Sequence, residues 1–248
     1  MSITSPSSIE VALEGKTIVI FGGTSGIGLA AAIQAKQAGG QVIVVGYEAA
    51  RAEQVAAEQG FAGWRAADIT KGESVHAALQ DLERVDHLVL LAGTFVAGKT
   101  LEADLAYLQR AFEERVWGAI HALRALGNRI SNKGSVTLIS GALADRPNAF
   151  GTSVLAAASA AMEALARGLA LELAPIRVNA LSPGPTNTPI LAKTLGQDRD
   201  GYVAALEQKL PLHRLGRPEE VGAGVVFLMS NGFMNGATLN VDGGSPLV

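Results

Sequence analysis

Residues 16–28 read Lys-Thr-Ile-Val-Ile-Phe-Gly-Gly-Thr-Ser-Gly-Ile-Gly, an apolar run that gives way to closely spaced glycines. The β-branched first half predicts a buried parallel strand over Thr17–Phe21, and the glycines predict a tight turn into an alanine-rich helix from Gly26. Glycines let the backbone approach a pyrophosphate, and a helix N-terminus offers unpaired N–H groups and partial positive charge. The segment therefore predicts a dinucleotide site, with a purely structural strand-to-helix turn as the alternative.

Strand-like apolar runs and amphipathic segments alternate through the rest of the chain. The expected strands are Thr17–Phe21, Gln41–Gly46, Gly63–Ala67, His87–Ala92, Gly134–Ser140, Ile176–Leu181 and Thr238–Val241. The expected helices are Gly26–Ala38, Ala50–Gln59, Lys71–Leu82, Leu101–Asn128, Phe150–Leu173 and Pro218–Met229. This βαβ alternation predicts an α/β fold with a single Rossmann-type domain over residues 13–248, a doubly wound parallel sheet of about seven strands with helices on both faces.

Two segments fall outside this alternation. Residues 1–12 are polar and are expected to form a flexible N-terminal arm without the features of a signal peptide. The stretch from Ser182 to about Asp200 contains three prolines and is expected to be irregular, as part of a lid or substrate loop around 183–205.

Composition restricts the classes of function. The 248 residues carry a net charge of −3, which gives no electrostatic reason to expect nucleic acid or an anionic membrane as partner. No apolar run is expected to be long enough to span a membrane. The chain has no cysteine, which excludes disulfides and thiolate chemistry. The histidines show no metal-ligand spacing, so we expect no metal site. Because the sequence shows neither a signal peptide nor a membrane-spanning run, we expect a cytoplasmic protein.

Several ordered motifs extend over nearly the whole chain. They are Gly22–Gly28 preceded by Phe21, Ala66–Thr70, Leu91–Gly93, Ile176–Gly184, Leu215–Val221 and Gly236–Gly244. In this order they resemble the short-chain dehydrogenase/reductase family, with Phe21 replacing a usual threonine and Leu91 preceding an Ala-Gly pair that has lost the family's two asparagines. The resemblance implies NAD(P)(H) as cofactor and a small molecule as substrate.

The resemblance also implies a set of cofactor-binding residues. They are Gly22, Thr24, Ser25, Gly26, Ile27, Gly28, Tyr47, Glu48, Arg51, Asp68, Ile69, Ala92, Gly93, Pro183, Gly184, Thr186 and Thr188. An acid after the second strand binds the ribose 2′-OH of NAD, whereas a base accommodates the phosphate of NADP. Gly46 stands where the family often places that acid, so the sequence favours NADP(H) over NAD(H).

The catalytic positions of the family are mostly changed. Members use a Ser-Tyr-Lys set, often with an asparagine, in which tyrosine is the general acid/base. Ser140 fits the serine, whereas Leu155 and Ser159 stand at the tyrosine and lysine positions, and Arg115 at that of asparagine. A register shifted by two places Ser153 and Ala157 there and does not restore the pair.

Two hypotheses follow for the function. In the first, the protein is an atypical NAD(P)H-dependent oxidoreductase of the carbonyl reductase or alcohol dehydrogenase type, with Ser140, Arg115 and Tyr202 as candidate catalytic residues. Arg115 would stabilise a developing oxyanion, or else form an ion pair with Glu113, with Glu114 or with an acidic residue elsewhere. In the second, the protein is a catalytically inactive regulatory or structural protein that binds NAD(P). A Ser-His-Asp hydrolase is disfavoured because Ser140 lacks a Gly-x-Ser-x-Gly elbow.

The substrate and the assembly state can be predicted only coarsely. The expected cleft residues Leu155, Leu143, Phe150, Ile190 and Leu191 favour a small apolar substrate. The family resemblance implies a homo-oligomer, a dimer or a tetramer, through the helices expected over 101–128 and 150–173.

Overall fold

A computed structural model of the chain describes residues 13–195 and 199–248, so the expected arm at residues 1–12 lies outside the described residues. The strands are β1 Thr17–Phe21, β2 Gln41–Gly46, β3 Gly63–Ala66, β4 Val85–Leu90, β5 Ile130–Ile139, β6 Arg177–Pro183 and β7 Thr238–Val241. The α-helices are α1 Gly26–Gln37, α2 Ala49–Gln59, α3 Gly72–Leu79, α4 Leu105–Phe112, α5 Gly118–Leu126, α6 Ser153–Glu172, α7 Pro189–Leu195, α8 Arg199–Lys209 and α9 Pro218–Ser230.

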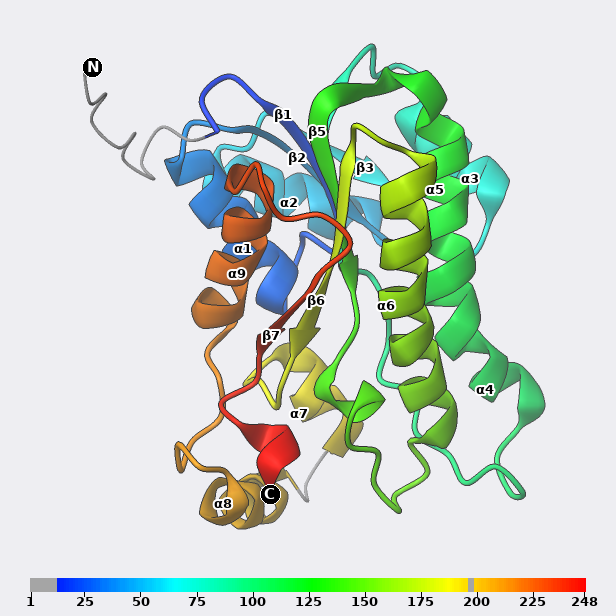
Figure 1. Ribbon diagram of the computed structural model, residues 1–248, viewed down its shortest axis with the longest axis vertical. Helices are drawn as coiled ribbons and strands as arrows, with labels where there is room; N and C mark the ends of the chain where they lie inside the picture. Colours follow the sequence, from blue (N-terminus) through cyan, green and yellow to red (C-terminus); the bar gives the residue numbers. More distant parts are fainter. Residues whose placement is uncertain (1–12, 196–198) are drawn as a thin grey trace.

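The strands form one parallel sheet in the order β3-β2-β1-β4-β5-β6-β7, which confirms the expected doubly wound architecture. Helices α1, α2 and α9 lie on one side of the sheet and α3, α5 and α6 on the other (Figure 1). Strands β2 and β3 are added on one side of β1, and β4 to β7 follow on the other side, so the strand order reverses between β1 and β4. In such folds the crevice beyond the carboxyl ends of these two strands is where ligands bind.

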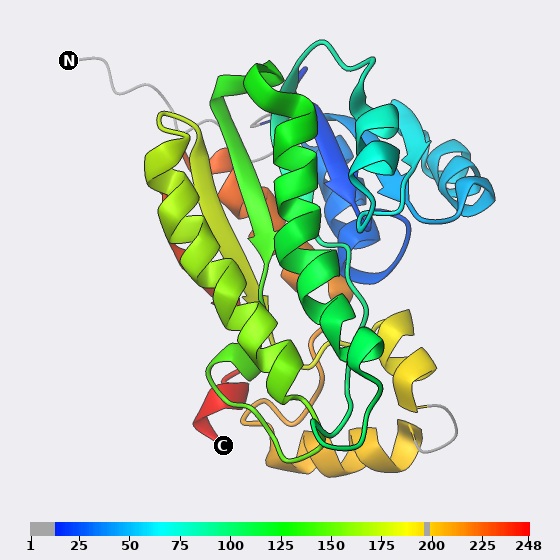
Figure 2. The same cartoon turned by 90° about the vertical axis from the view of Figure 1, so that its right-hand side faces the viewer.

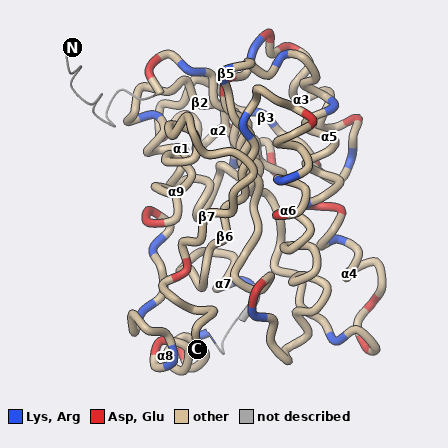
Figure 3. The backbone as a smooth tube through the Cα atoms, in the orientation of Figure 1, with Lys and Arg blue, Asp and Glu red and all other residues tan. Residues whose placement is uncertain are grey.

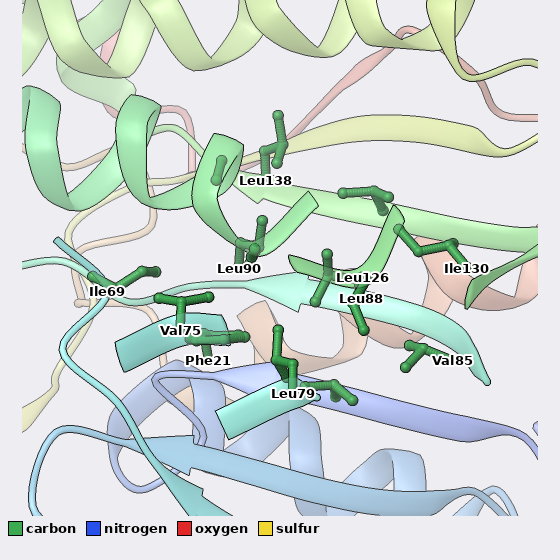
Figure 4. Close-up of a cluster of buried hydrophobic side chains, with 14 of the residues drawn as sticks. Phe21, Ile69, Val75, Leu79, Val85, Leu88, Leu90, Leu126, Ile130 and Leu138 are labelled. Atoms are coloured by element: carbon green, nitrogen blue, oxygen red, sulfur yellow. The ribbon is translucent and has the colours of Figure 1, made fainter. Parts of the chain in front are cut away.

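The two layers of helices are held by alternate side chains of the same strands. Ile18 and Ile20 of β1 pack with α1 and α9, whereas Val19 and Phe21 point to the opposite face. This alternation is the period-two geometry of a strand that is buried on both sides. Figure 4 shows Phe21, Leu88, Leu90 and Leu138 together with Leu126 of α5, in the cluster on the face to which Val19 and Phe21 point.

Three expectations about helices are wrong in part. The helix expected over 101–128 is two α-helices joined by a π-helical segment, Glu113–Trp117. The lid is not irregular throughout, because it contains α7 and α8, which cover the lower end of the molecule in Figure 2. Finally, we expected no apolar run long enough to span a membrane, but the 20 residues of α6 pass that test by length and composition. In this fold α6 packs on the sheet.

Charged residues lie mainly on the outer helices and connecting loops. Figure 3 shows Lys and Arg interspersed with Asp and Glu over the face that it presents.

Candidate dinucleotide site and reaction centre

The turn between β1 and α1 is built for close backbone approach. A Cβ atom on Gly28 would lie 2.1 Å from the carbonyl oxygen of Gly22, and one on Gly22 would lie 2.9 Å from the backbone nitrogen of Ala92. Gly22 also has a φ of 77°, which side-chain-bearing residues rarely adopt. Only glycines therefore fit these two positions, and they bring the turn against the end of β4.

The N-terminus of α1 has no side-chain cap. Its N-cap, Ser25, makes no side-chain hydrogen bond, and the first turn carries no acidic residue. The partial positive charge of the helix end is thus left for an external acceptor. Together with the glycine cradle, this end fits a pyrophosphate group.

The segment at the end of β2 lies beside this turn. A Cβ on Gly46 would lie 2.8 Å from Cγ2 of Thr24, so a larger residue has no room there unless Thr24 moves. Tyr47 is 76% exposed, Glu48 is the N-cap of α2 without a side-chain bond, and the guanidinium of Arg51 contacts only Gln54 at 3.5 Å among the described hydrogen bonds.

Asp68 and Ile69, after β3, are held by local bonds. The Asp68 carboxylate accepts hydrogen bonds from the backbone N–H and the hydroxyl of Thr70, at 3.0 and 2.7 Å. The carbonyl of Ile69 contacts Nδ1 of His121 at 3.3 Å. His121 thus has a structural contact.

The loop after β4 is clamped to the π-helical segment by Glu114, a residue that sequence reasoning did not select. The buried carboxylate of Glu114 accepts hydrogen bonds from the backbone N–H and hydroxyl of Thr94, at 2.6 and 2.8 Å. It also pairs with Arg110 at 2.7 Å, and this contact raises the pKa of Arg110. The carboxylate therefore ties Gly93 and Thr94 to the helix that carries Arg115.

Arg115 does not form the ion pair that was the alternative for it. Its Nη2 donates to the carbonyl of Thr94 at 3.1 Å, and Cζ lies 3.2 Å from the position of a Cβ on Gly93. Nε and Nη1 are buried, and neither has a hydrogen-bond partner in the described part of the chain. Burial lowers the pKa of the guanidinium, although the nearby Glu114 opposes this shift.

Ser140, directly after β5, turns its hydroxyl into the contact with α6. Oγ lies 2.7 Å from Oε1 of Glu163 and 3.0 Å from the carbonyl oxygen of Ser159, both of which accept. Glu163 was not selected from the sequence, although it follows Ser159 by four residues and so lies on the same helix face. The adjacent Gly141 faces the centre instead: its Cβ position lies 3.8 Å from Oγ of Ser159 and 3.9 Å from the carbonyl oxygen of Pro183.

The expected apolar lining is divided between core and surface. Leu155 is 3% exposed and packs with Val96, Leu108 and Leu143 in a small core between α4 and α6. Phe150 and Ile190 are 76% and 43% exposed, respectively. The structure therefore gives Leu155 and Leu143 a packing role and leaves Phe150 and Ile190 accessible.

The lid reaches back over the glycine turn. Thr188 lies 3.3 Å from the Cβ position of Gly26, and the lid is anchored where Thr186 bridges to Gly216. Pro183 ends β6 and Gly184 follows it, and a Cβ on Gly184 would lie 2.5 Å from the carbonyl oxygen of Asp242. Tyr202 lies on α8, 40% exposed, and no hydrogen bond in the described part of the chain joins it to Ser140 or Arg115.

Comparison with known proteins places this geometry among oxidoreductases. A family model described as enoyl-(acyl carrier protein) reductase matches residues 22–245. The chain is 35% identical to the short-chain dehydrogenase/reductase ATR9 of Stachybotrys chlorohalonatus, covering 94% of this chain and 98% of the relative. It is 32% identical to the galactitol 2-dehydrogenase (L-tagatose-forming) of Cereibacter sphaeroides, covering 94% and 95%. A small-chain dehydrogenase solved in complex with NADPH superimposes with a TM-score of 0.82 at 33% identity, covering 95% of this chain and all of the other.

Proposed function

Because this chain belongs to the short-chain dehydrogenase/reductase family and is an NAD(P)-dependent oxidoreductase, we propose that it reduces the carbonyl group of a small, largely apolar molecule without the family's tyrosine–lysine pair. The observation that carries the proposal is the glycine turn at the crevice between β1 and β4, where Gly22 and Gly28 leave no room for side chains. The N-terminus of α1 beside it, which has no side-chain cap, fits a dinucleotide. The bound cofactor would supply hydride chemistry there.

The side chains of α6 support the second half of the proposal. This helix contains neither tyrosine nor lysine, and Leu155 and Ser159, at the family's tyrosine and lysine positions, are both buried. We assign the remaining work to positioning, which alone accounts for several kcal/mol of a barrier, about 7 or more in favourable intramolecular cases. Ser140 orients the substrate oxygen once its hydroxyl turns from Glu163.

The segment after β2 supports a preference for NADP(H). Thr24 fills the space beside Gly46, so this position offers no acid to the ribose 2′-OH. Arg51 is exposed, with only a 3.5 Å contact to Gln54. We expect Arg51→Ala to weaken NADPH binding about tenfold and to leave NADH binding within about twofold, because one charge-assisted bond to the 2′-phosphate is lost. Equal losses for both cofactors would contradict this assignment.

The proposed function is tested by titrating the purified protein with NADPH and NADH. Nicotinamide fluorescence and thermal shift report binding, and a panel of aldehydes and ketones added to the same samples reports oxidation of the cofactor. Binding followed by oxidation supports the reductase. Binding without oxidation across the panel would instead favour a regulatory NAD(P)-binding protein, and absence of binding would contradict the site.

A further inference from the structure

Arg115 occupies the point of the fold where a ligand is expected. The glycine turn touches Ala92, whose backbone nitrogen lies 2.9 Å from the Cβ position of Gly22. The Arg115 guanidinium packs against the next residue, Gly93, and its Cζ lies 3.2 Å from the Cβ position of that glycine. A fixed positive charge therefore lies one residue from the contact between the β1 turn and the end of β4, at the reversal of the sheet order.

The charge is not neutralised within the protein. The nearest acid, Glu114, accepts from Thr94 and from Arg110, and Arg115 forms no ion pair among the described residues. One of its three nitrogens donates to the carbonyl of Thr94, and the other two are buried with no hydrogen-bond partner among residues 13–195 and 199–248. A guanidinium stays protonated at any working pH, so it cannot relieve this situation by losing its proton. Unpaired buried donors are unfavourable, and in native proteins they indicate a missing partner.

The chain geometry indicates that this arrangement is held in place. Arg115 lies in the π-helical segment Glu113–Trp117, which interrupts the run from α4 to α5. Such single-turn insertions occur often at functional sites. The Glu114 clamp fixes Thr94 against the same segment, so the acceptor of Nη2 and the helix move together. The guanidinium is consequently oriented before any ligand arrives.

We propose that Arg115 binds an anionic oxygen of the ligand at this crevice, either a phosphate oxygen of the dinucleotide or a carboxylate that the substrate carries beside its carbonyl group. This inference rests on the proposed function. If the substrate supplies the anionic oxygen, the substrate class is narrowed to apolar molecules that carry one ionised oxygen group. Guanidinium is suited to both groups because its donors match planar and tetrahedral oxyanions. An alkoxide that forms on the substrate only during the reaction does not explain the arrangement, because the Arg115 guanidinium would stay unpaired before the reaction begins.

The test compares Arg115→Met, Arg115→Lys and the wild type, with Arg124→Met as the matched control on the exposed surface of α5. Fluorescence titration with NADPH and calorimetry with ADP-ribose, which shares the pyrophosphate, measure the cofactor arm. The substrate arm uses phenylpyruvate and phenylacetone added to each protein–NADPH complex; these probes differ only in carboxylate against methyl. The melting midpoint of each ligand-free protein is recorded in parallel, and neither arm requires turnover.

We expect Arg115→Met to lose about 10- to 100-fold in affinity in one arm, the loss produced by removing a charge-assisted bond. A loss for NADPH and ADP-ribose identifies the cofactor as the source. A loss for phenylpyruvate but not for phenylacetone identifies a substrate carboxylate. Arg115→Lys should retain part of the affinity, and the ligand-free Arg115→Met protein should melt at or above the wild-type midpoint, because a buried unpaired charge is removed.

Unchanged affinity in both arms for Arg115→Met would overturn the inference, as would an equal loss in Arg124→Met. Such a result leaves the proposed function standing if the wild type still binds NADPH. If the wild type binds neither NADPH nor NADH, the proposed function fails, and titration of phenylpyruvate and inorganic pyrophosphate into the ligand-free proteins decides the role of Arg115 by the same comparison.

Discussion

A single methyl group decides whether the turn between β1 and α1 can form. A Cβ on Gly28 would lie 2.1 Å from the Gly22 carbonyl oxygen, closer than any contact can be. We expect Gly28→Ala to lose measurable NADPH binding and about 1–3 kcal/mol of unfolding free energy, because backbone must shift to admit the methyl. Fluorescence titration and urea unfolding measure the two effects.

Gly168→Ala is the control for that substitution. Gly168 lies within α6 and nothing lies within 4 Å of its Cβ position, so alanine there should add about 0.5–1 kcal/mol of stability and leave NADPH binding unchanged. Normal cofactor affinity in Gly28→Ala would show that the turn does not hold the dinucleotide.

At the scale of elements, the π-helical segment depends on one buried carboxylate. The Glu114 side chain is 7% exposed, whereas its partner Arg110 is 50% exposed. Glu114→Gln should therefore cost about 1.5–3 kcal/mol, since it weakens the bonds to Thr94 and to Arg110 together. Arg110→Ala should cost about 1 kcal/mol or less because its charge is largely solvated. Urea unfolding of both variants compares the losses, and equal losses would contradict the clamp.

The same segment shows where sequence reasoning ends. Alternating apolar runs located all seven strands to within a few residues, because burial on both faces demands them. The π-helical segment left no trace in the periodicity, since one extra residue in a turn changes no composition. The unpaired state of Arg115 was equally hidden. It depends on the hydrogen bond from Thr94 to the carboxylate of Glu114, two residues that lie twenty positions apart in the sequence. Helices α7 and α8 were missed because the prolines before them indicate a loop.

For the molecule as a whole, stability depends on a histidine in the middle of the sheet. His87 of β4 is 5% exposed, and its Nδ1 lies 2.8 Å from the hydroxyl of Ser135 on β5. Burial, assisted by the charge of Arg177, lowers the pKa of His87 from 6.5 to about 4. The folded protein therefore keeps this ring neutral at a pH where the unfolded chain takes up a proton.

The sign of the resulting pH dependence follows from that difference in proton uptake. Above pH 6.5 neither state protonates His87, and its contribution to stability is fully present; it is lost as the pH falls toward 4, because the unfolded chain then binds one more proton. The loss approaches about 3 kcal/mol at its largest. Urea unfolding at about pH 5 and about pH 7.5 should show a smaller difference for His87→Gln than for the wild type. His76→Gln, at an exposed position on α3, should retain the wild-type difference. An equal pH dependence in His87→Gln and the wild type would mean that the acid sensitivity of this fold originates elsewhere.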